Sequence, residues 1–152
     1  MTRSIKDWQE KINAWAIRKE WRGPNATPRP LGIDLMLWVT EVAEAFECLR
    51  ITDEPLAEWR SYSVVKDEVK FENLTYGQLG VLLDCDSYSE LDALIEELGL
   101  IPKPEGWAWE TADLLIRIFE TCEEHGVDIE PYVEAKMKYN ETRELRHGGK
   151  LM

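Results

Sequence analysis

The chain has 152 residues, of which 44% are hydrophobic and 32% are charged, a composition typical of a globular domain that buries a substantial core. Its formal net charge of −12 argues against binding to nucleic-acid polymers, because phosphate backbones attract clusters of Lys and Arg. An enzyme that acts on free nucleotides stays compatible with this charge, because metal ions can bridge acidic side chains and phosphates.

Two features predict a cytoplasmic protein with no membrane association. The N-terminal residues contain no apolar signal segment, and no stretch approaches ~18 consecutive apolar residues. The three cysteines, Cys48, Cys85 and Cys122, are an odd number and lack the spacing of a disulfide framework. Reduced thiols in a cytosolic compartment are the simpler interpretation.

The first predicted element is a helix that Ser4 caps and that runs to about Trp21. Segment 22–30 ends it, because three prolines and one glycine in nine residues leave no regular backbone. Arg22 and Arg29 in this loop either form a phosphate-facing edge beside Trp21 or are solvated. The side chains that recur at helical spacing and form the buried stripe of this helix are Ile5, Trp8, Ile12, Trp15 and Ala16.

The second predicted helix begins around Ile33 or Asp34 and extends to about Leu49. Glu41 and Glu44 are three positions apart, so that they lie on one helix face beside the apolar stripe. Taken alone, two such acids are also typical of a solvated helix face. The main apolar stripe of this helix consists of Trp38, Val42, Ala45, Phe46 and Leu49.

Residues 51–104 are interpreted as an ordered insertion within a single domain that covers residues 1–152. Residues 53–62 look helical. Residues 63–74 either continue that helix or form short strands. No internal repeat or low-complexity run occurs here, and the role of the insertion is not evident from its residues.

Two further helices are expected within the insertion. A short one covers 74–83, and a second follows Asp86 or Ser87, with Gly99 as its C-terminal stop. Residues 101–106 are interpreted as a turn-rich connector, because two prolines and a glycine occur in six residues.

The third core helix is expected over about 107–124, because apolar residues recur at helical spacing around one narrow polar face. Glu110, Asp113 and Arg117 fall on that face. Glu110 and Asp113 repeat the acid spacing of the second helix, and four carboxylates from two helices suit Mg²⁺, a hard cation that prefers oxygen ligands. The alternative is an i,i+4 salt bridge between Asp113 and Arg117.

Gly126 ends that helix and a last one follows, with Asp128 or Glu130 near its cap and Pro131 in its first turn. Four hydrogen-bond donors then recur at helical spacing and form one ridge in a chain otherwise rich in acid. Such a ridge suits phosphate oxygens, because Arg gives planar two-point contacts and Lys a mobile charge. The alternative is a basic helix end that complements the helix dipole and the acidic surface. The ridge consists of Lys136, Asn140, Arg143 and His147.

Three blocks of the chain together resemble MazG-like nucleotide pyrophosphohydrolases of the all-α NTP pyrophosphatase superfamily. They are EVAEAFE at 41–47, KPEGWAWETADLLIRIFE at 103–120 and KMKYNETRELRHGGK at 136–150, in the order in which the family has them. The resemblance implies an all-α fold, a helical bundle with an insertion between its second and third core helices, which associates as homo-dimers or homo-tetramers. It also implies hydrolysis of an NTP or dNTP to the monophosphate and pyrophosphate with Mg²⁺, for which Mn²⁺ can substitute.

The resemblance also implies roles for individual residues. The metal-binding and catalytic acids of the family match Glu41, Glu44, Glu110 and Asp113. Its phosphate- and nucleotide-contacting positions match Lys136, Asn140 and Arg143. Among the acids, Glu44 is the preferred general base. Candidates for the wall on which the substrate's base stacks are Trp15, Trp21, Trp38 and Trp107.

One spacing departs from the family pattern. Glu110 follows Glu44 by 66 positions, a longer interval than we expect between the two acid motifs. The two helices can still meet, because the entropy of loop closure rises slowly with loop length. Two alternatives stay open: an acidic helical protein-interaction module without catalysis, and a narrower dUTP or dCTP diphosphatase.

Overall fold

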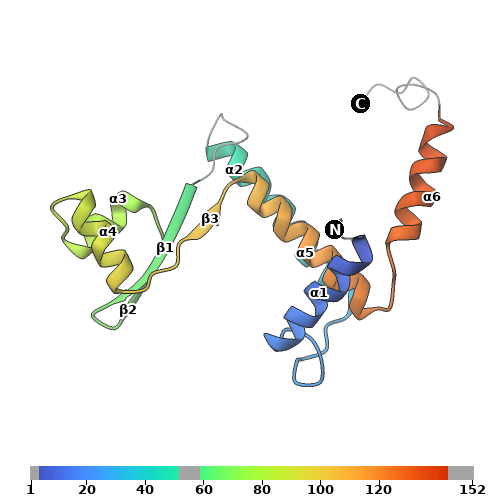
Figure 1. The fold of residues 1–152 in the computed structure, drawn as a ribbon, viewed down its shortest axis with the longest axis horizontal. Helices are drawn as coiled ribbons and strands as arrows, with labels where there is room; N and C mark the ends of the chain where they lie inside the picture. The colour runs from blue at the N-terminus through green and yellow to red at the C-terminus, as the bar shows by residue number, and fades with distance from the viewer. Residues whose placement is uncertain (1–3, 52–58, 144–152) are drawn as a thin grey trace. The chain divides into compact units, whose positions relative to one another are not determined.

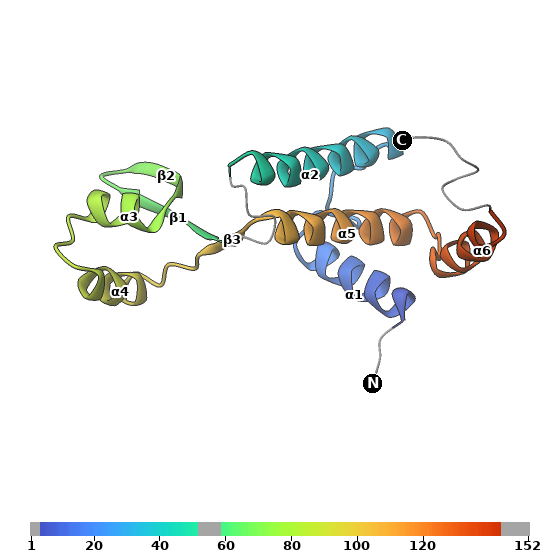
Figure 2. The same cartoon turned by 90° about the horizontal axis from the view of Figure 1, so that it is seen from above.

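The computed structural model describes residues 4–51 and 59–143. In these ranges the chain forms six helices and a three-stranded antiparallel sheet (Figures 1 and 2). The prediction of an all-α fold is therefore wrong, because the protein combines helices with a sheet. In chain order the elements are α1 Ile5–Arg18, α2 Leu31–Ile51, β1 Trp59–Lys66, β2 Val69–Leu74, α3 Tyr76–Leu83, α4 Tyr88–Glu97, β3 Lys103–Glu105, α5 Trp107–Glu124 and α6 Glu130–Glu141.

Except for Glu105 at the end of β3, the sheet forms within the segment 51–104 that was interpreted as an insertion, and its strand order is β2-β1-β3. Asp67 and Glu68 make a two-residue turn between β1 and β2, and their φ angles of +51° and +64° are those of a type I′ hairpin turn. Along β1 the side chains of Tyr62 and Val64 face inward. Aromatic and β-branched residues at alternating positions favour a strand, so the predicted helix over 53–62 is wrong for its last four residues; 53–58 lie outside the described residues.

Helices α3 and α4 pack with the β1–β2 hairpin and complete a small core (Figure 1). The hydroxyls of Thr75 and Ser87 cap these helices by accepting the backbone N–H of Gln78 and Glu90. Of the two caps that the sequence allowed for α4, Asp86 and Ser87, the structure has Ser87. Gly99 follows α4 with a φ of +60°, so the predicted stop at Gly99 is confirmed. The buried residues of this core are Tyr62, Val64, Leu79 and Leu91.

The chain divides into two compact units. The first comprises residues 1–39 and 114–152, and the second comprises residues 40–113. The segment 51–104 that was interpreted as an insertion lies within the second unit. Helices α2 and α5 each contribute residues to both units.

In the first unit, α1 begins as predicted. The hydroxyl of Ser4 accepts the N–H of Asp7, and the carboxylate of Asp7 accepts the N–H of Ser4. The buried face of α1 also contains a polar residue, Gln9, which is fully buried. Its amide donates to the carbonyl of Val127 at 2.8 Å and accepts the N–H of Ile129 at 3.2 Å, which attaches the segment before α6 to α1.

A buried charge cluster of Arg22, Arg29, Asp34 and Glu120 holds the loop after α1. Arg22 places Nη2 2.8 Å from Asp34 Oδ1 and Nε 2.7 Å from Glu120 Oε1. Arg29 contacts the same two carboxylates at 3.3 and 3.1 Å. The side chains of Arg22, Asp34 and Glu120 are each at most 4% exposed. The prediction of a solvated side chain is therefore wrong for Arg22, which two buried carboxylates engage, whereas Arg29 contacts the same carboxylates and stays 25% exposed. A phosphate contact of Arg29 stays a prediction.

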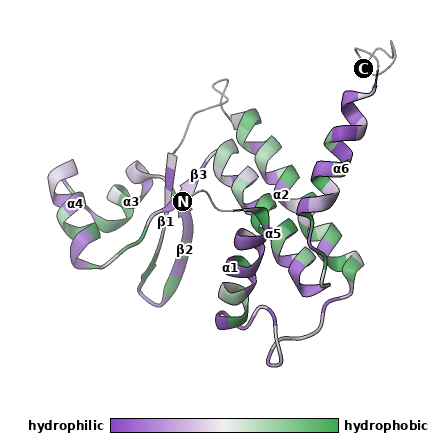
Figure 3. Cartoon of the chain, turned by 45° about the vertical axis from the view of Figure 1, so that its right-hand side comes forward, coloured by the Kyte–Doolittle hydropathy of each residue, from purple (hydrophilic) through white to green (hydrophobic). Residues whose placement is uncertain are grey.

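Apolar residues line α2 and α5, whereas α6 is mostly hydrophilic (Figure 3). Helix α5 has the bounds that the sequence predicted. On α2 a large part of the apolar surface is exposed, including Val42 and Phe46 of the predicted stripe, which are 53% and 63% exposed. Exposed apolar side chains aligned on one helix are typical of an interaction surface.

Candidate functional site

Three carboxylates from two helices meet in the second unit. Ligand oxygens of Glu41 on α2 and of Glu110 and Asp113 on α5 all lie within 4.8 Å of one another. Glu41 and Glu110 are buried, with exposed fractions of 6% and 2%, whereas Asp113 is exposed. We call these three residues the acidic cluster. Of the four acids that the sequence predicted, Glu44 is exposed on α2 and is not among the three.

The turn before α5 determines where Glu110 lies. Gly106 is buried and has a φ of +126°, a backbone conformation that L side chains rarely adopt. Its carbonyl accepts the N–H of Trp109 at 3.0 Å and that of Glu110 at 3.2 Å, and these bonds begin the helix. Glu110 therefore lies in the first turn, and Asp113 follows on the same face because residues three apart share a helix face.

Glu110 has a strongly perturbed carboxyl group. Burial raises its pKa to about 7; the positive charge of Lys103 opposes the rise, while a hydrogen bond to Glu105 and the negative charge of Glu44 add to it. The Oε2 atom of Glu110 is buried and has no hydrogen-bond partner among the described residues. A cation bound in the acidic cluster would stabilise the ionised form of this carboxyl.

Lys103 and Glu105 of β3 border the acidic cluster, and the sequence did not predict them as site residues. Lys103 Nζ lies 3.8 Å from Glu110 Oε1 and 3.1 Å from Glu105 Oε2. Glu105 Oε1 also accepts the hydroxyl of Ser61 at 2.7 Å. Burial lowers the pKa of Lys103, but its acidic neighbours raise the pKa by more, so that Lys103 stays charged. In the sequence, the only indication of these two residues is that two charged side chains alternate with prolines. The prolines of segment 101–106 led to its interpretation as a connector and not as a strand.

The predicted ridge of donors lies in the first unit and is only partly helical. Lys136 and Asn140 are exposed on α6, and Lys136 Nζ lies 5.1 Å from the ring centroid of Tyr139. Helix α6 ends at Glu141, so the exposed Arg143 follows the helix and does not continue its face. His147 lies outside the described residues.

The tryptophans proposed as a stacking wall differ in their surroundings. Trp21 is 47% exposed and packs edge-to-face on Trp15 with 4.8 Å between ring centroids. Trp38 donates from Nε1 to the hydroxyl of Thr121 at 3.3 Å. Trp107 begins α5 and is 39% exposed. The surroundings of Trp15 and Trp38 are typical of packing residues, whereas Trp21 and Trp107 keep accessible surface.

The acidic cluster fits a hard divalent cation. Carboxylate oxygens are the ligands that Mg²⁺ prefers, and Mg²⁺ commonly takes only a few of them while keeping waters and substrate phosphates in its remaining positions. The unpartnered Oε2 of Glu110 provides one such ligand inside the protein, and the exposed Asp113 leaves access for water and substrate. Within residues 4–51 and 59–143, this is the one group of three or more acidic, histidine or cysteine side chains with a geometry suitable for a metal.

Comparisons with known proteins give no relative: no family model matches the chain, and no significant match to a curated protein or to a solved structure was found.

Across the described residues, none of the helices combines the length and the apolar character that crossing a membrane requires. All three cysteines are free thiols, as the sequence predicted.

Proposed function

We propose that the protein hydrolyses a nucleoside triphosphate, either an NTP or a dNTP, to the monophosphate and pyrophosphate in a reaction that depends on Mg²⁺, with Mn²⁺ as a possible substitute. The observation that carries the proposal is the meeting of Glu41 of α2 with Glu110 and Asp113 of α5, two helices far apart in the sequence, around a buried and unpartnered carboxylate oxygen. The resemblance of the three sequence blocks to MazG-like pyrophosphohydrolases gives the reaction class. We expect the enzyme to act in the cytoplasm.

In this reaction we assign a separate role to each residue of the site. Glu41, Glu110 and Asp113 would hold the metal ion, which would supply positive charge for the triphosphate and lower the pKa of an attacking water. Glu44, exposed beside the acidic cluster, is the preferred base and takes the proton of the water that attacks the α-phosphorus while pyrophosphate leaves. Lys103, charged and 3.8 Å from Glu110, is placed to steady negative charge on the phosphates. Phosphate contacts by Lys136, Asn140 and Arg143 stay a prediction from the resemblance.

The proposed function is tested with a panel of NTPs and dNTPs, including dUTP and dCTP. With Mg²⁺ we expect at least one substrate to yield the monophosphate and pyrophosphate, and no orthophosphate, in a coupled pyrophosphate assay. Addition of EDTA should abolish the release, because the acidic cluster alone cannot neutralise a triphosphate. No turnover of any member of the panel with Mg²⁺ or Mn²⁺ favours the alternative of an acidic protein-interaction module. Turnover confined to dUTP or dCTP favours the narrower diphosphatase.

We propose further that the enzyme is a homo-oligomer whose copies meet through one stripe of α2. The stripe recurs at alternating steps of four and three residues, the heptad spacing with which two helices pack against each other. Its side chains are between 37% and 63% exposed, so that a second copy presenting the same stripe would bury apolar surface that one copy leaves in water. The α2 stripe consists of Leu35, Val39, Val42, Phe46 and Leu49.

Replacing Phe46, the most exposed member of the α2 stripe, tests this association. Phe46→Glu is expected to convert the assembly to monomers at micromolar concentration, because it places a charge in the apolar seam, and sedimentation velocity measures the change in mass. Val81→Glu is the matched control, because Val81 is an apolar residue of α3 that is 83% exposed and lies outside the stripe. The same oligomer in wild type and Phe46→Glu, or a monomeric wild type, contradicts the proposal.

A further inference from the structure

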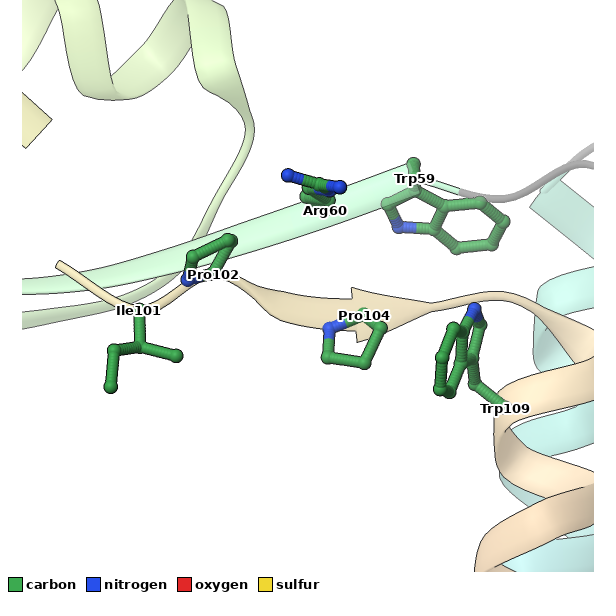
Figure 4. Close-up of a pocket in the computed structure, with 6 residues that line it drawn as sticks. All are labelled: Trp59, Arg60, Ile101, Pro102, Pro104 and Trp109. Atoms are coloured by element: carbon green, nitrogen blue, oxygen red, sulfur yellow. The ribbon is translucent and has the colours of Figure 1, made fainter. Parts of the chain in front are cut away.

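A hollow of about 450 Å³ lies where β1 and β3 approach the start of α5, and this volume is within the range of ligand pockets. Figure 4 shows the indole rings of Trp59 and Trp109 near each other at one end of the hollow, with the ring of Pro104 beside them. Ile101 and Pro102 lie at the other end (Figure 4). The sixth lining residue is Arg60.

The lining of the hollow is suited to a flat heterocyclic ring. Trp59 is half-buried and Trp109 is 43% exposed, so both indoles have surface available for stacking. Arg60 contributes hydrogen-bond donors beside them, and among the residues that the structure describes it forms no ion pair, in contrast to the engaged Arg22 and Arg29. An aromatic wall with an exposed guanidinium binds a planar ring that carries hydrogen-bond acceptors at its edge.

The hollow and the acidic cluster are built from the same two short segments. Trp109 directly precedes Glu110, so their Cα atoms are only about 3.8 Å apart. Trp59 is the partner of Glu105 in the β1–β3 ladder, and residues directly opposite each other in a ladder project to the same face of a sheet. Because Lys103 Nζ lies 3.1 Å from Glu105 Oε2 and 3.8 Å from Glu110 Oε1, that face leads to the acidic cluster. Arg60 and its ladder partner Pro104 project to the other face of the sheet, so a ligand that places phosphates at the acidic cluster reaches the hollow past Trp109 and Trp59.

We propose that this hollow is the nucleobase subsite of the enzyme, in which the base stacks on Trp59 and Trp109 and accepts hydrogen bonds from Arg60. The inference rests on the proposed function, because it concerns the same substrate. It assigns base recognition to the sheet and not to Trp21. The strands of the segment 51–104 thereby gain a role: they form one wall of the substrate site.

Binding measurements with non-hydrolysable ligands test this subsite in the full-length protein. The probes are the α,β-methylene analogues of ATP, GTP, CTP and UTP, together with inorganic tripolyphosphate, which has phosphates but no base, all with Mg²⁺ in a calorimeter. The variants are Trp59→Ala and Trp109→Ala. Trp8→Ala is the matched control, because Trp8 is 40% exposed on α1 and does not line the hollow. Circular dichroism compares the unfolding midpoints of the variants.

Each variant of the hollow is expected to raise the Kd of at least one analogue by about tenfold or more, the size of a lost base-stacking contact. The Kd of tripolyphosphate should stay within about twofold, and Trp8→Ala should leave both Kd values unchanged. This pattern supports the subsite even if the wild type releases no pyrophosphate, in which case the proposed function fails and the subsite stands.

Three results overturn the subsite. The first is a Kd within about twofold of the wild type for every analogue in both variants; continued pyrophosphate release then leaves the proposed function intact. The second is an equal loss of affinity for tripolyphosphate and for the analogues, which means that the base contributes nothing to the effect. The third is a wild-type protein that binds tripolyphosphate but none of the analogues.

Discussion

Replacing Glu110 with glutamine is expected to lower kcat/KM for pyrophosphate release by at least about a hundredfold, since residues that only support a metal's ligands already cost 10–100-fold when they are lost. Glutamine keeps the size of the side chain and removes the negative charge that would hold Mg²⁺. Glu110 is the member of the acidic cluster with a buried and unpartnered oxygen, so no other carboxylate replaces it. Initial rates at saturating Mg²⁺ measure the effect.

The same variant should be more stable than the wild type when the metal is absent and the pH is high. Burial raises the pKa of Glu110 to about 7, so the folded protein binds this proton more tightly than the unfolded chain. The resulting stabilisation is complete below the ordinary pKa of a glutamate and is lost as the pH rises through 7. Glu110→Gln never ionises and keeps a neutral side chain. In EDTA at pH 8 we expect it to exceed the wild type by about 1–3 kcal/mol in the free energy of unfolding, a difference that disappears near pH 4.

Glu124→Gln is the control for both measurements, because Glu124 lies exposed at the far end of the same helix. It should change neither kcat/KM nor the pH dependence of stability. Full activity in Glu110→Gln means that the acidic cluster has no part in catalysis. Lost activity without the gain in stability at pH 8 means instead that the carboxyl of Glu110 is not strained by burial in the metal-free protein.

Arg22→Ala is expected to destabilise the protein by about 3–5 kcal/mol, the usual cost of removing one partner from a buried ion pair. Arg22 is the side chain that contacts both Asp34 and Glu120 at 2.8 Å or less, and both carboxylates are at most 2% exposed. Arg29 alone cannot neutralise two buried negative charges, and His125 lies 3.8 Å from Asp34 with charge only when protonated. Urea unfolding measures the change in the free energy of unfolding.

Arg50→Ala supplies the comparison for that experiment. Arg50 pairs with Glu47 at 2.8 Å on the surface of α2, with side chains 65% and 53% exposed. Water screens exposed ion pairs, so Arg50→Ala should destabilise the protein several-fold less than Arg22→Ala, although each variant removes one arginine from a close ion pair. Similar destabilisation by both variants contradicts a special role for the buried charge cluster.

Local signals predicted the helical elements well. Helix α5 has the predicted bounds, the hydroxyls of Ser4 and Ser87 cap the predicted helices, and Gly99 ends α4. Helix caps, stops and bounds depend on residues within one or two helical turns of each other, so they can be predicted from neighbouring positions in the sequence. The short strands that the sequence left open for 63–74 are present in β1 and β2, but the third strand was missed. It was missed because β3 contributes only three residues, one of them a proline, and gains its hydrogen bonds from β1 more than forty residues earlier.

The sequence by itself determined which acids lie one helical turn apart and which of their neighbours are apolar, because helix periodicity is a local property. Only the tertiary structure decided that Glu41 meets Glu110 and Asp113, that Glu44 stays exposed outside this cluster, and that Lys103 and Glu105 border it. It likewise decided that Arg22 and Arg29 are bound to buried carboxylates. Each of these outcomes depends on contacts between residues far apart in the chain. Charges are buried and paired only when folding brings those residues together, so neighbouring positions in the sequence do not reveal the free energy of these contacts.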